Sequence, residues 1–126
     1  MFKRIDHVAI SVKDREKSIE FYTKNFGFQK YYEHDVPGVP ELLKVVYLKL
    51  GDTVLEFEHW KGEKSNKGYH FCLISDNFYG DYKRLKEEGI PIETDVHNTS
   101  PRTEEEVNWK RVVFLGPDNE LIEIRG

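Results

Sequence analysis

The sequence predicts an α+β fold in which two tandem modules each have the element order β-α-β-β-β. Short alternating apolar runs typical of strands recur along the chain, and one helix-like segment follows the first run of each half. Each half also carries an early histidine and a late glutamate: His7 and His70 are 63 residues apart, and Glu56 and Glu123 are 67 apart. An internal duplication explains this near-equal spacing better than chance.

The domain organisation follows from the length of the chain. At 126 residues it has the size of one ordinary domain. We predict a single domain over 1–126, built from a first module, 1–64, and a second module, 65–126. The two modules must share a core because the chain is too short for two independent cores.

The first module begins with a strand and a capped helix. Alternation over Ile5 to Val12 predicts the strand and places His7 on its less apolar face. Asp14 is a suitable N-cap for a helix over REKSIEFYTKNF, and Gly27 is a suitable stop. Further strands are predicted at about 29–34, 42–50 and 53–60, the last two joined by a turn at 51–52.

The second module repeats this order after a polar connection, 61–68. A strand carries His70, and a helix is predicted between a cap at Asp76 and a stop at Gly89. Further strands are predicted at about 91–96, 110–115 and 120–125, with a turn at 116–119. The polar segment 98–107 predicts a loop, which is either a lid over a site or a solvated connection.

Composition excludes several classes of protein. Charged residues make up 33% of the chain, hydrophobic residues 38%, and the mean hydropathy is −0.66, which is typical of a soluble globular protein. Because there is no signal-like or membrane-spanning apolar run, we expect a cytoplasmic protein with no membrane partner. A single cysteine, Cys72, excludes a disulfide framework, and a net charge of −4 gives no basic face for nucleic acid.

The repeated histidines and glutamates predict a divalent-metal site. Period two puts Glu56 and Glu58 on one face of their strand, and the same parity lets all four repeated residues face one concave side. Two carboxylates brought together on half-buried strands repel each other unless a cation joins them. Imidazole and carboxylate ligands suit Zn²⁺, Ni²⁺, Co²⁺, Mn²⁺ or Fe²⁺ without selecting among them. The predicted ligands are His7, Glu56, His70 and Glu123.

A structural role is the competing interpretation for each of these residues taken singly, and only their duplication favours metal binding. Glu58 is the main rival ligand, because it shares a face with Glu56. We interpret His34, His59 and His97 as surface or loop residues, since none has a repeat partner. Cys72 is expected to be a small buried packing residue near the site.

The motifs of the chain resemble those of the vicinal oxygen chelate superfamily, which includes glyoxalase I, bleomycin-resistance proteins and extradiol dioxygenases. IDHVAISVKDREKSIEFYTKNFGF resembles the opening strand and helix of that family, and FLGPDNELIEI resembles its closing hairpin. The family's four metal positions fall on the four predicted ligands. The resemblance implies paired modules that form a curved mixed sheet around a metal cup. Gly116 and Asn119 depart from the family's turn, in which Asp and Gly are common.

The resemblance further implies a glyoxalase I-like lyase or isomerase. A divalent metal would hold the oxygens of a small carbonyl substrate, such as the hemithioacetal of a 2-oxoaldehyde, and stabilise an enolate. Glu123 is the first choice for the base and Glu56 the second. A thiol cofactor such as glutathione would need cationic partners for its carboxylates, and the chain offers Arg102, Lys110, Arg111 and Arg125.

Other activities of the same superfamily stay open at this point. Extradiol dioxygenases and fosfomycin-modifying enzymes use two histidines and one glutamate as metal ligands, which His7, His70 and Glu123 would supply. Epimerases that act beside a thioester carbonyl need a similar stabilisation of an enolate. A non-catalytic drug-binding module is a further alternative, for which Trp60 and Trp109 are candidate stacking residues. The resemblance also implies a homodimer.

Overall fold

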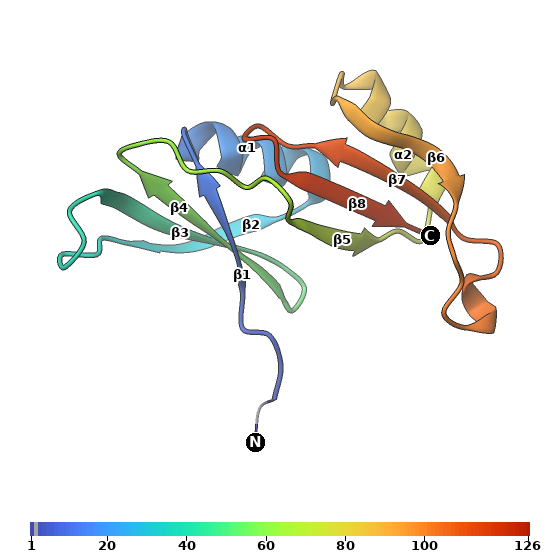
Figure 1. Cartoon of the computed structure of the whole chain (residues 1–126), viewed down its shortest axis with the longest axis horizontal. Coiled ribbons are helices and arrows are strands. Elements are labelled where there is room, and N and C mark those ends of the chain that lie inside the picture. The colour runs from blue at the N-terminus through green and yellow to red at the C-terminus, as the bar shows by residue number, and fades with distance from the viewer. Residues whose placement is uncertain (2) are drawn as a thin grey trace. The chain divides into compact units, whose positions relative to one another are not determined.

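The computed structural model describes residues 1 and 3–126 of the chain, which form two compact units, 1–66 and 67–126 (Figure 1). Each unit holds one four-stranded mixed sheet and one long helix. The predicted α+β class and the repeated β-α-β-β-β order are therefore confirmed. The strands form two separate sheets, one in each unit.

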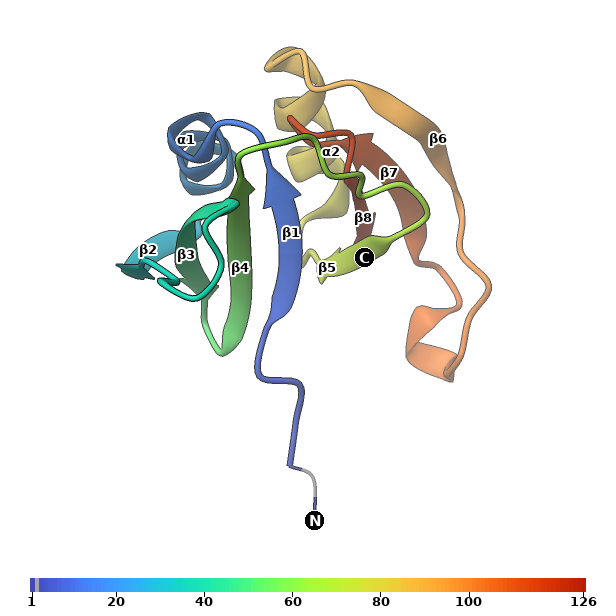
Figure 2. The same cartoon turned by 60° about the vertical axis from the view of Figure 1, so that its left-hand side comes forward.

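The first unit contains β1, α1, β2, β3 and β4 in chain order. Their bounds are Val8–Val12, Arg15–Phe26, Gln29–His34, Leu42–Leu50 and Thr53–Trp60. The sheet order is β1-β4-β3-β2; β1 runs parallel to β4, and the other neighbours are antiparallel. Figure 2 shows β1 beside β4. The first and last strands of the unit are thus direct neighbours.

The second unit repeats this topology. Its elements β5, α2, β6, η1, β7 and β8 span His70–Ile74, Phe78–Glu87, Ile92–Asn98, Glu104–Glu106, Lys110–Leu115 and Leu121–Arg125. The order is β5-β8-β7-β6, with β5 parallel to β8 and the others antiparallel. The short 3-10 helix η1 lies within the segment expected to be a loop.

The predicted caps are correct for α1, whereas for α2 the stop at Gly89, with a φ of 78°, is correct and the N-cap is displaced by one residue. Lys17 N donates to Asp14 Oδ1 over 3.1 Å, and Gly27 ends α1 with a left-handed φ of 78°. In the second unit the N-cap is Asn77 rather than Asp76, and its side chain makes no capping hydrogen bond. The first strand begins at Val8 rather than Ile5.

The core of the first unit is built around α1 and the inner strands. Tyr22 is fully buried, and its ring centroid lies 5.2 Å from that of Phe57 and 5.8 Å from that of Phe28. Such tilted and edge-to-face arrangements are favourable for aromatic rings. This packing fixes α1 against β4, the strand that carries Glu56.

The turn before β8 explains the departure from the family pattern at 119. Asn119 has a φ of 63°, a left-handed conformation that asparagine tolerates better than most residues other than glycine. Its backbone N–H donates to Gly116 O over 3.0 Å. The turn therefore keeps its shape with asparagine where glycine is common.

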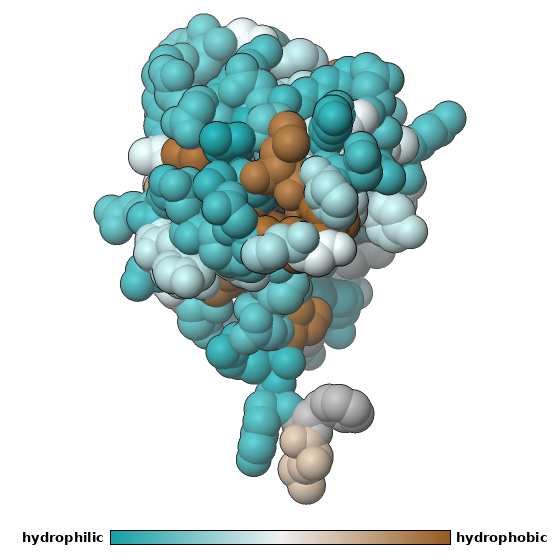
Figure 3. All heavy atoms as spheres, turned by 90° about the vertical axis from the view of Figure 1, so that its left-hand side faces the viewer, coloured by the Kyte–Doolittle hydropathy of each residue, from teal (hydrophilic) through white to brown (hydrophobic). Residues whose placement is uncertain are grey.

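The surface of the molecule agrees with its composition. Figure 3 shows one face, which is mainly hydrophilic with a few small hydrophobic areas. No helix among the described residues is long and apolar enough to cross a membrane.

Replacing Phe57 by alanine tests the packing that holds β4. The substitution removes a fully buried ring that contacts Tyr22. We expect the free energy of unfolding, measured with urea, to fall by about 3 to 5 kcal/mol. Tyr69→Ala, at a side chain that is 77% exposed, is the control and should leave the urea midpoint nearly unchanged. Equal effects of the two variants would contradict this account of the core.

Candidate functional site

The first histidine and glutamate meet across the parallel pair β1 and β4. Ala9 is the register partner of Glu56, and His7 lies two residues before Ala9, so its side chain points to the same side. His7 Nε2 lies 2.9 Å from Glu56 Oε2. Glu56 is only 8% exposed, so this carboxylate needs a polar or cationic partner.

The second histidine and glutamate meet in the same way across β5 and β8. Cys72 is the register partner of Glu123, and His70 lies two residues before Cys72. His70 Nε2 lies 3.4 Å from Glu123 Oε2, and Glu123 is also 8% exposed. The duplication seen in the sequence thus extends to the structure. In both units the histidine lies two residues before the register partner of the glutamate, and Nε2 of the histidine faces Oε2 of the glutamate.

Asp6 orients the imidazole of His7. Asp6 Oδ2 lies 3.0 Å from His7 Nδ1, which leaves Nε2 directed at Glu56. This hydrogen bond is the main cause that raises the pKa of His7, with smaller contributions from the charges of Glu56 and Asp6. A carboxylate on the far nitrogen is a common way to fix the orientation of a metal-binding histidine. In the second unit Tyr69 precedes His70, so this feature is not repeated.

Two further side chains lie beside Glu56. Tyr47 on β3 is its register partner and hydrogen-bonds to it, and burial followed by the charge of Glu56 raises the pKa of the Tyr47 hydroxyl. Glu58 lies two residues along β4, where burial and then the charge of Glu56 raise the pKa of its carboxyl group. Glu58 therefore lies near Glu56 as its parity indicated, and its role as a rival ligand stays a prediction.

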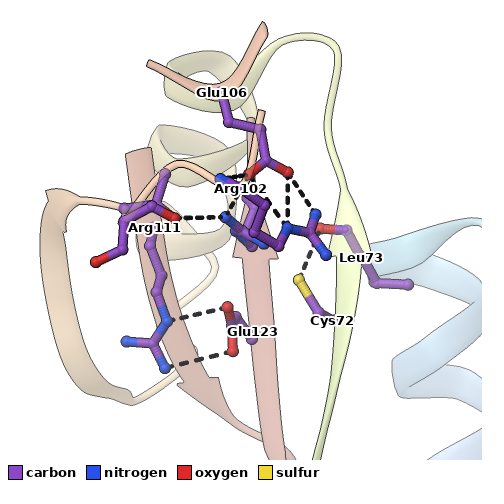
Figure 4. Close-up of polar contacts among 9 residues, drawn as sticks. Cys72, Leu73, Arg102, Glu106, Arg111 and Glu123 are labelled. Atoms are coloured by element: carbon purple, nitrogen blue, oxygen red, sulfur yellow. Dashed lines mark hydrogen bonds and ion pairs between the residues drawn. The ribbon is translucent and has the colours of Figure 1, made fainter. Parts of the chain in front are cut away.

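Glu123 has a partner that sequence reasoning did not assign to it. Arg111 Nε donates to Glu123 Oε1 over 3.0 Å, and Arg111 Nη2 donates to Glu123 Oε2 over 3.3 Å (Figure 4). Arg111 lies on β7 two residues before Val113, the register partner of Glu123. The matching position of the first unit, two residues before Tyr47, is Val45. The two glutamates therefore differ in their cationic partners.

A second arginine cluster anchors the segment between β6 and β7. Glu106 is 4% exposed, and it accepts hydrogen bonds from the backbone N–H of Arg102 and from the guanidinium groups of Arg102 and Arg125 (Figure 4). These hydrogen bonds lower the pKa of Glu106 to about 2. Residues 102–106 are thus held against β8 through Arg125, whereas the sequence left open whether this segment is a lid or a solvated connection.

A cavity opens beside these arginines within the second unit. Its volume is about 420 Å³. Its lining comes from the end of β6, the following segment, β7 and β8, and consists of His97, Asn98, Thr99, Ser100, Arg102, Arg111, Glu123 and Arg125. Glu123 therefore faces a polar cavity as well as His70.

Comparison with known proteins decides the family. Residues 4–124 match the family described as the Glyoxalase/Bleomycin resistance protein/Dioxygenase superfamily. The chain belongs to this superfamily.

The relatives of this superfamily member include both curated sequences and solved structures. The chain is 31% identical over 125 residues to the human mitochondrial methylmalonyl-CoA epimerase, with 90% of the chain aligned to 66% of that protein. It thus spans just under two thirds of the length of this relative. Its fold matches Leishmania major glyoxalase I with a TM-score of 0.72 at 24% identity, covering 98% of this chain and 86% of that one. It also matches the fosfomycin resistance protein FosX of Listeria monocytogenes, complexed with Mn(II) and sulfate, with a TM-score of 0.72 at 16% identity, covering 100% and 93%.

The spacing of the donor atoms in each pair is close to that of two ligands on one metal ion. Two ligands bound at about 2.1 Å and at angles of about 90° to 110° lie about 3.0 to 3.4 Å apart. The nitrogen and oxygen of the two pairs are separated by 2.9 and 3.4 Å. Within either unit, the described residues hold no group of three or more His, Cys, Asp and Glu side chains able to bind a metal. The structure thus presents the predicted ligands as two pairs, one in each unit.

Cys72 differs from its predicted environment. It is exposed, so the expectation of a buried packing residue is wrong. Its register partner is Glu123, so it lies near the predicted site, as its parity with His70 indicated. Partial desolvation, followed by the charge of Glu123, raises the pKa of the thiol to about 11. The thiol is therefore protonated and weakly nucleophilic near neutral pH.

Alkylation of Cys72 tests this environment. A rise of the pKa from 9.0 to about 11 lowers the thiolate fraction at pH 8 about 100-fold, and the higher nucleophilicity of the thiolate recovers about tenfold. We therefore expect iodoacetamide, followed by mass spectrometry, to react about tenfold more slowly than with an unperturbed thiol. Glu123→Gln should speed the reaction, because it removes the neighbouring negative charge. A wild-type rate equal to that of N-acetylcysteine would contradict the prediction.

Acid titration tests the anchoring of Glu106. Its pKa in the folded protein, about 2, lies below its ordinary value of 4.5, so the folded state binds fewer protons than the unfolded state between these values. Its contribution to stability is present above pH 4.5 and is lost as the pH falls toward 2. The difference in urea midpoint between wild type and Glu106→Gln should shrink over this range.

A matched control comes from the same 3-10 helix. Glu104→Gln removes an equal charge from an exposed residue. The difference in urea midpoint between wild type and Glu104→Gln should be small. It should also vary little between pH 4.5 and pH 2, where the difference for Glu106→Gln declines. A constant difference for Glu106→Gln would show that the ion pairs do not stabilise the folded state.

Proposed function

We propose that the chain is a divalent-metal-dependent enzyme that removes and returns a proton at a carbon beside a carbonyl group. The observation that carries the proposal is the repeated contact between a histidine Nε2 and a buried glutamate Oε2, at the same offset in both units. The proposed ligands are His7, Glu56, His70 and Glu123. Membership of a superfamily that includes an epimerase and a glyoxalase I supports this reaction class.

The metal would be Ni²⁺, Zn²⁺, Co²⁺, Mn²⁺ or Fe²⁺. When bound, it supplies positive charge to the carbonyl oxygen on which negative charge develops. The residues of the chain bind and orient the metal ligands. Asp6 holds the ring of His7 in orientation, and the neutral form of each histidine is the form that binds a metal.

The proton is moved by a glutamate. Inversion of a carbon centre needs one group to remove a proton and another to return one, and the duplication supplies Glu56 and Glu123 in similar strand positions. Resemblance to glyoxalase I favours Glu123. The contacts favour Glu56, because Arg111 donates to both oxygens of Glu123 while the corresponding residue beside Glu56 is Val45. We propose Glu56 as the group that removes the proton.

Among the carbonyl substrates, a thioester is the first choice. Curated relatives at 31% identity are methylmalonyl-CoA epimerases, whereas the likeness to glyoxalase I concerns the fold. A glyoxalase I-like reaction on a hemithioacetal is the second choice. A dioxygenase that uses only His7, His70 and Glu123 would leave Glu56 without a role, yet Glu56 is as buried as Glu123 and contacts its histidine more closely.

A drug-binding module is the second candidate function, and an aromatic cluster favours it. Tyr31 and Tyr32 are exposed at the surface, and with His34 they surround Tyr47, which lies beside His7. Such rings can stack on a flat ligand. Ligand binding that survives both Glu56→Gln and Glu123→Gln would favour this candidate.

The proposed assembly follows from the resemblance, and the proposed location is the one expected from the sequence. We propose a cytoplasmic homodimer that acts on a small molecule. Light scattering of the purified protein measures the oligomeric state directly.

Metal content and proton exchange test the proposed enzyme together. The protein is stripped with a chelator, loaded with each candidate metal, and analysed by elemental mass spectrometry. Incubation with methylmalonyl-CoA in deuterated water, or with the hemithioacetal of methylglyoxal and glutathione, then reports exchange at the carbon beside the carbonyl. We expect near-stoichiometric metal, and exchange that falls about 10²- to 10⁴-fold in Glu56→Gln.

Matched variants separate ligands from other carboxylates. Glu123→Gln and His7→Ala should lose metal, whereas Glu93→Gln, an exposed glutamate of β6, should keep both metal and exchange. If none of the metals binds, or if exchange persists in Glu56→Gln and Glu123→Gln, the proposal fails.

A further inference from the structure

Three side chains of the first unit, Glu56, Tyr47 and His34, form a hydrogen-bonded series that we call the Tyr47 network. Tyr47 on β3 is the register partner of Glu56 on β4 and hydrogen-bonds to its carboxylate. His34, the last residue of β2, also contacts Tyr47. Its Nε2 lies 3.4 Å from the Tyr47 hydroxyl, and the two rings stack with centroids 5.7 Å apart and planes 16° apart. The buried Glu56 is thus connected through Tyr47 to a half-buried histidine.

The backbone determines which ring nitrogen of His34 carries the proton. His34 Nδ1 lies 2.9 Å from the carbonyl oxygen of Asp35, and a carbonyl oxygen can only accept a hydrogen bond. A neutral imidazole has a single N–H group, so in neutral His34 this group is at Nδ1 and Nε2 has a free lone pair. Neutral His34 is therefore a hydrogen-bond acceptor toward Tyr47.

Tyr47 consequently has one proton for two acceptors. Its hydroxyl group carries a single hydrogen, whereas the ionised carboxylate of Glu56 and Nε2 of neutral His34 can only accept. His7 supplies no proton to Glu56 while its ring is neutral, because Asp6 holds the ring proton on Nδ1. In this form Tyr47 satisfies only one of its two acceptors at a time.

One added proton on Glu56 completes the Tyr47 network. Protonated Glu56 donates to the oxygen of Tyr47, and the Tyr47 hydroxyl then donates to Nε2 of His34, so each of the three groups has a matching partner. The network therefore favours the form that Glu56 takes once it has removed a proton from a substrate. Glu123 is in a different setting, because Arg111 can only donate and so favours the ionised carboxylate.

We propose that Tyr47 and His34 are positioning residues for Glu56. The Tyr47 hydroxyl donates to the Glu56 carboxylate before proton transfer and turns to His34 Nε2 after it. In this step the C–H bond of the substrate breaks, its electron pair stays on the substrate as an enolate, and the proton forms an O–H bond on Glu56. The hydrogen bonds reverse when Glu56 loses the proton again. This inference rests on the proposed function, because it concerns the form of Glu56 during that reaction.

The positions of the imidazole protons test the Tyr47 network without any substrate. Long-range ¹H–¹⁵N spectra of the metal-free protein at about pH 9, where imidazoles are neutral, show which ring nitrogen carries the proton. We expect the Nδ1–H form for His34. His59 is the control in the same unit: its Nδ1 lies 2.8 Å from Nη1 of Arg15, which can only donate, so its proton should be on Nε2. The Nε2–H form at His34 would overturn the proposal.

The kinetics of proton exchange test the role of the Tyr47 hydroxyl. Tyr47→Phe keeps the aromatic ring and removes the donor. With metal-loaded protein and methylmalonyl-CoA in deuterated water, we expect kcat to fall about tenfold, and KM to change less than about twofold because the hydroxyl acts through Glu56 and not on the substrate. Tyr79→Phe, which removes a hydroxyl from an exposed ring on α2, should keep the kcat of wild type. An unchanged kcat in Tyr47→Phe would overturn the proposal.

A double variant tests whether His34 acts through Tyr47. His34→Phe keeps a ring for stacking but removes the acceptor, so kcat should fall by about threefold to tenfold. The same change in the Tyr47→Phe background should cause no further fall, because the hydroxyl that faces His34 is already absent. His34→Gln offers a carbonyl oxygen as acceptor and should recover part of the lost rate. Independent, multiplied losses in the double variant would overturn the proposal.

The positioning role and the proposed function fail in different ways. If wild type shows no exchange, the proposed reaction is removed, and the positioning role in that reaction is removed with it. If wild type shows exchange but His34 has the Nε2–H form, or Tyr47→Phe keeps the kcat of wild type, only the Tyr47 network is overturned and the enzyme stays in place.

Discussion

The parallel pairing of the first and last strand of each unit is the constraint on which the candidate site depends. Because β1 pairs with β4 and β5 with β8, a residue near the start of a unit lies beside a residue near its end. The register then places each histidine two residues before the partner of a glutamate. Since side chains alternate with period two, a slip of one residue would turn either glutamate to the opposite face and break the contact.

Local signals in the sequence were sufficient for most of the fold. The helix over 15–26 has a capping aspartate and a terminal glycine, and its predicted bounds agree with the structure. The strands at 29–34, 42–50, 53–60 and 110–115 also have the predicted bounds. The errors lie where such signals are weak. Asp76 and Asn77 are adjacent polar residues that could both cap α2, and the wrong one was predicted. Ile5 is apolar and was predicted to begin β1, but the strand pairs only from Val8.

The site could be predicted only in part, for a physical reason. Duplication and period two identify the residues of each pair, because both are properties of the sequence. The partner of Glu123 depends on how β7 aligns with β8, which is a non-local property. The only available signal was the parity of Arg111, two residues before the position opposite Glu123. The interaction of Glu106 with Arg102 and Arg125 likewise depends on a segment whose path the sequence does not specify.

The pairing of Arg111 with Glu123 makes the two halves of a duplicated fold unequal. A cation that approaches Glu123 must compete with a guanidinium already held by both oxygens, whereas at Glu56 it meets the hydroxyl of Tyr47. Two residues before the partner of the glutamate, the first copy has a valine on β3 and the second has an arginine on β7, so a single position gives one carboxylate a permanent counter-charge and leaves the other without it.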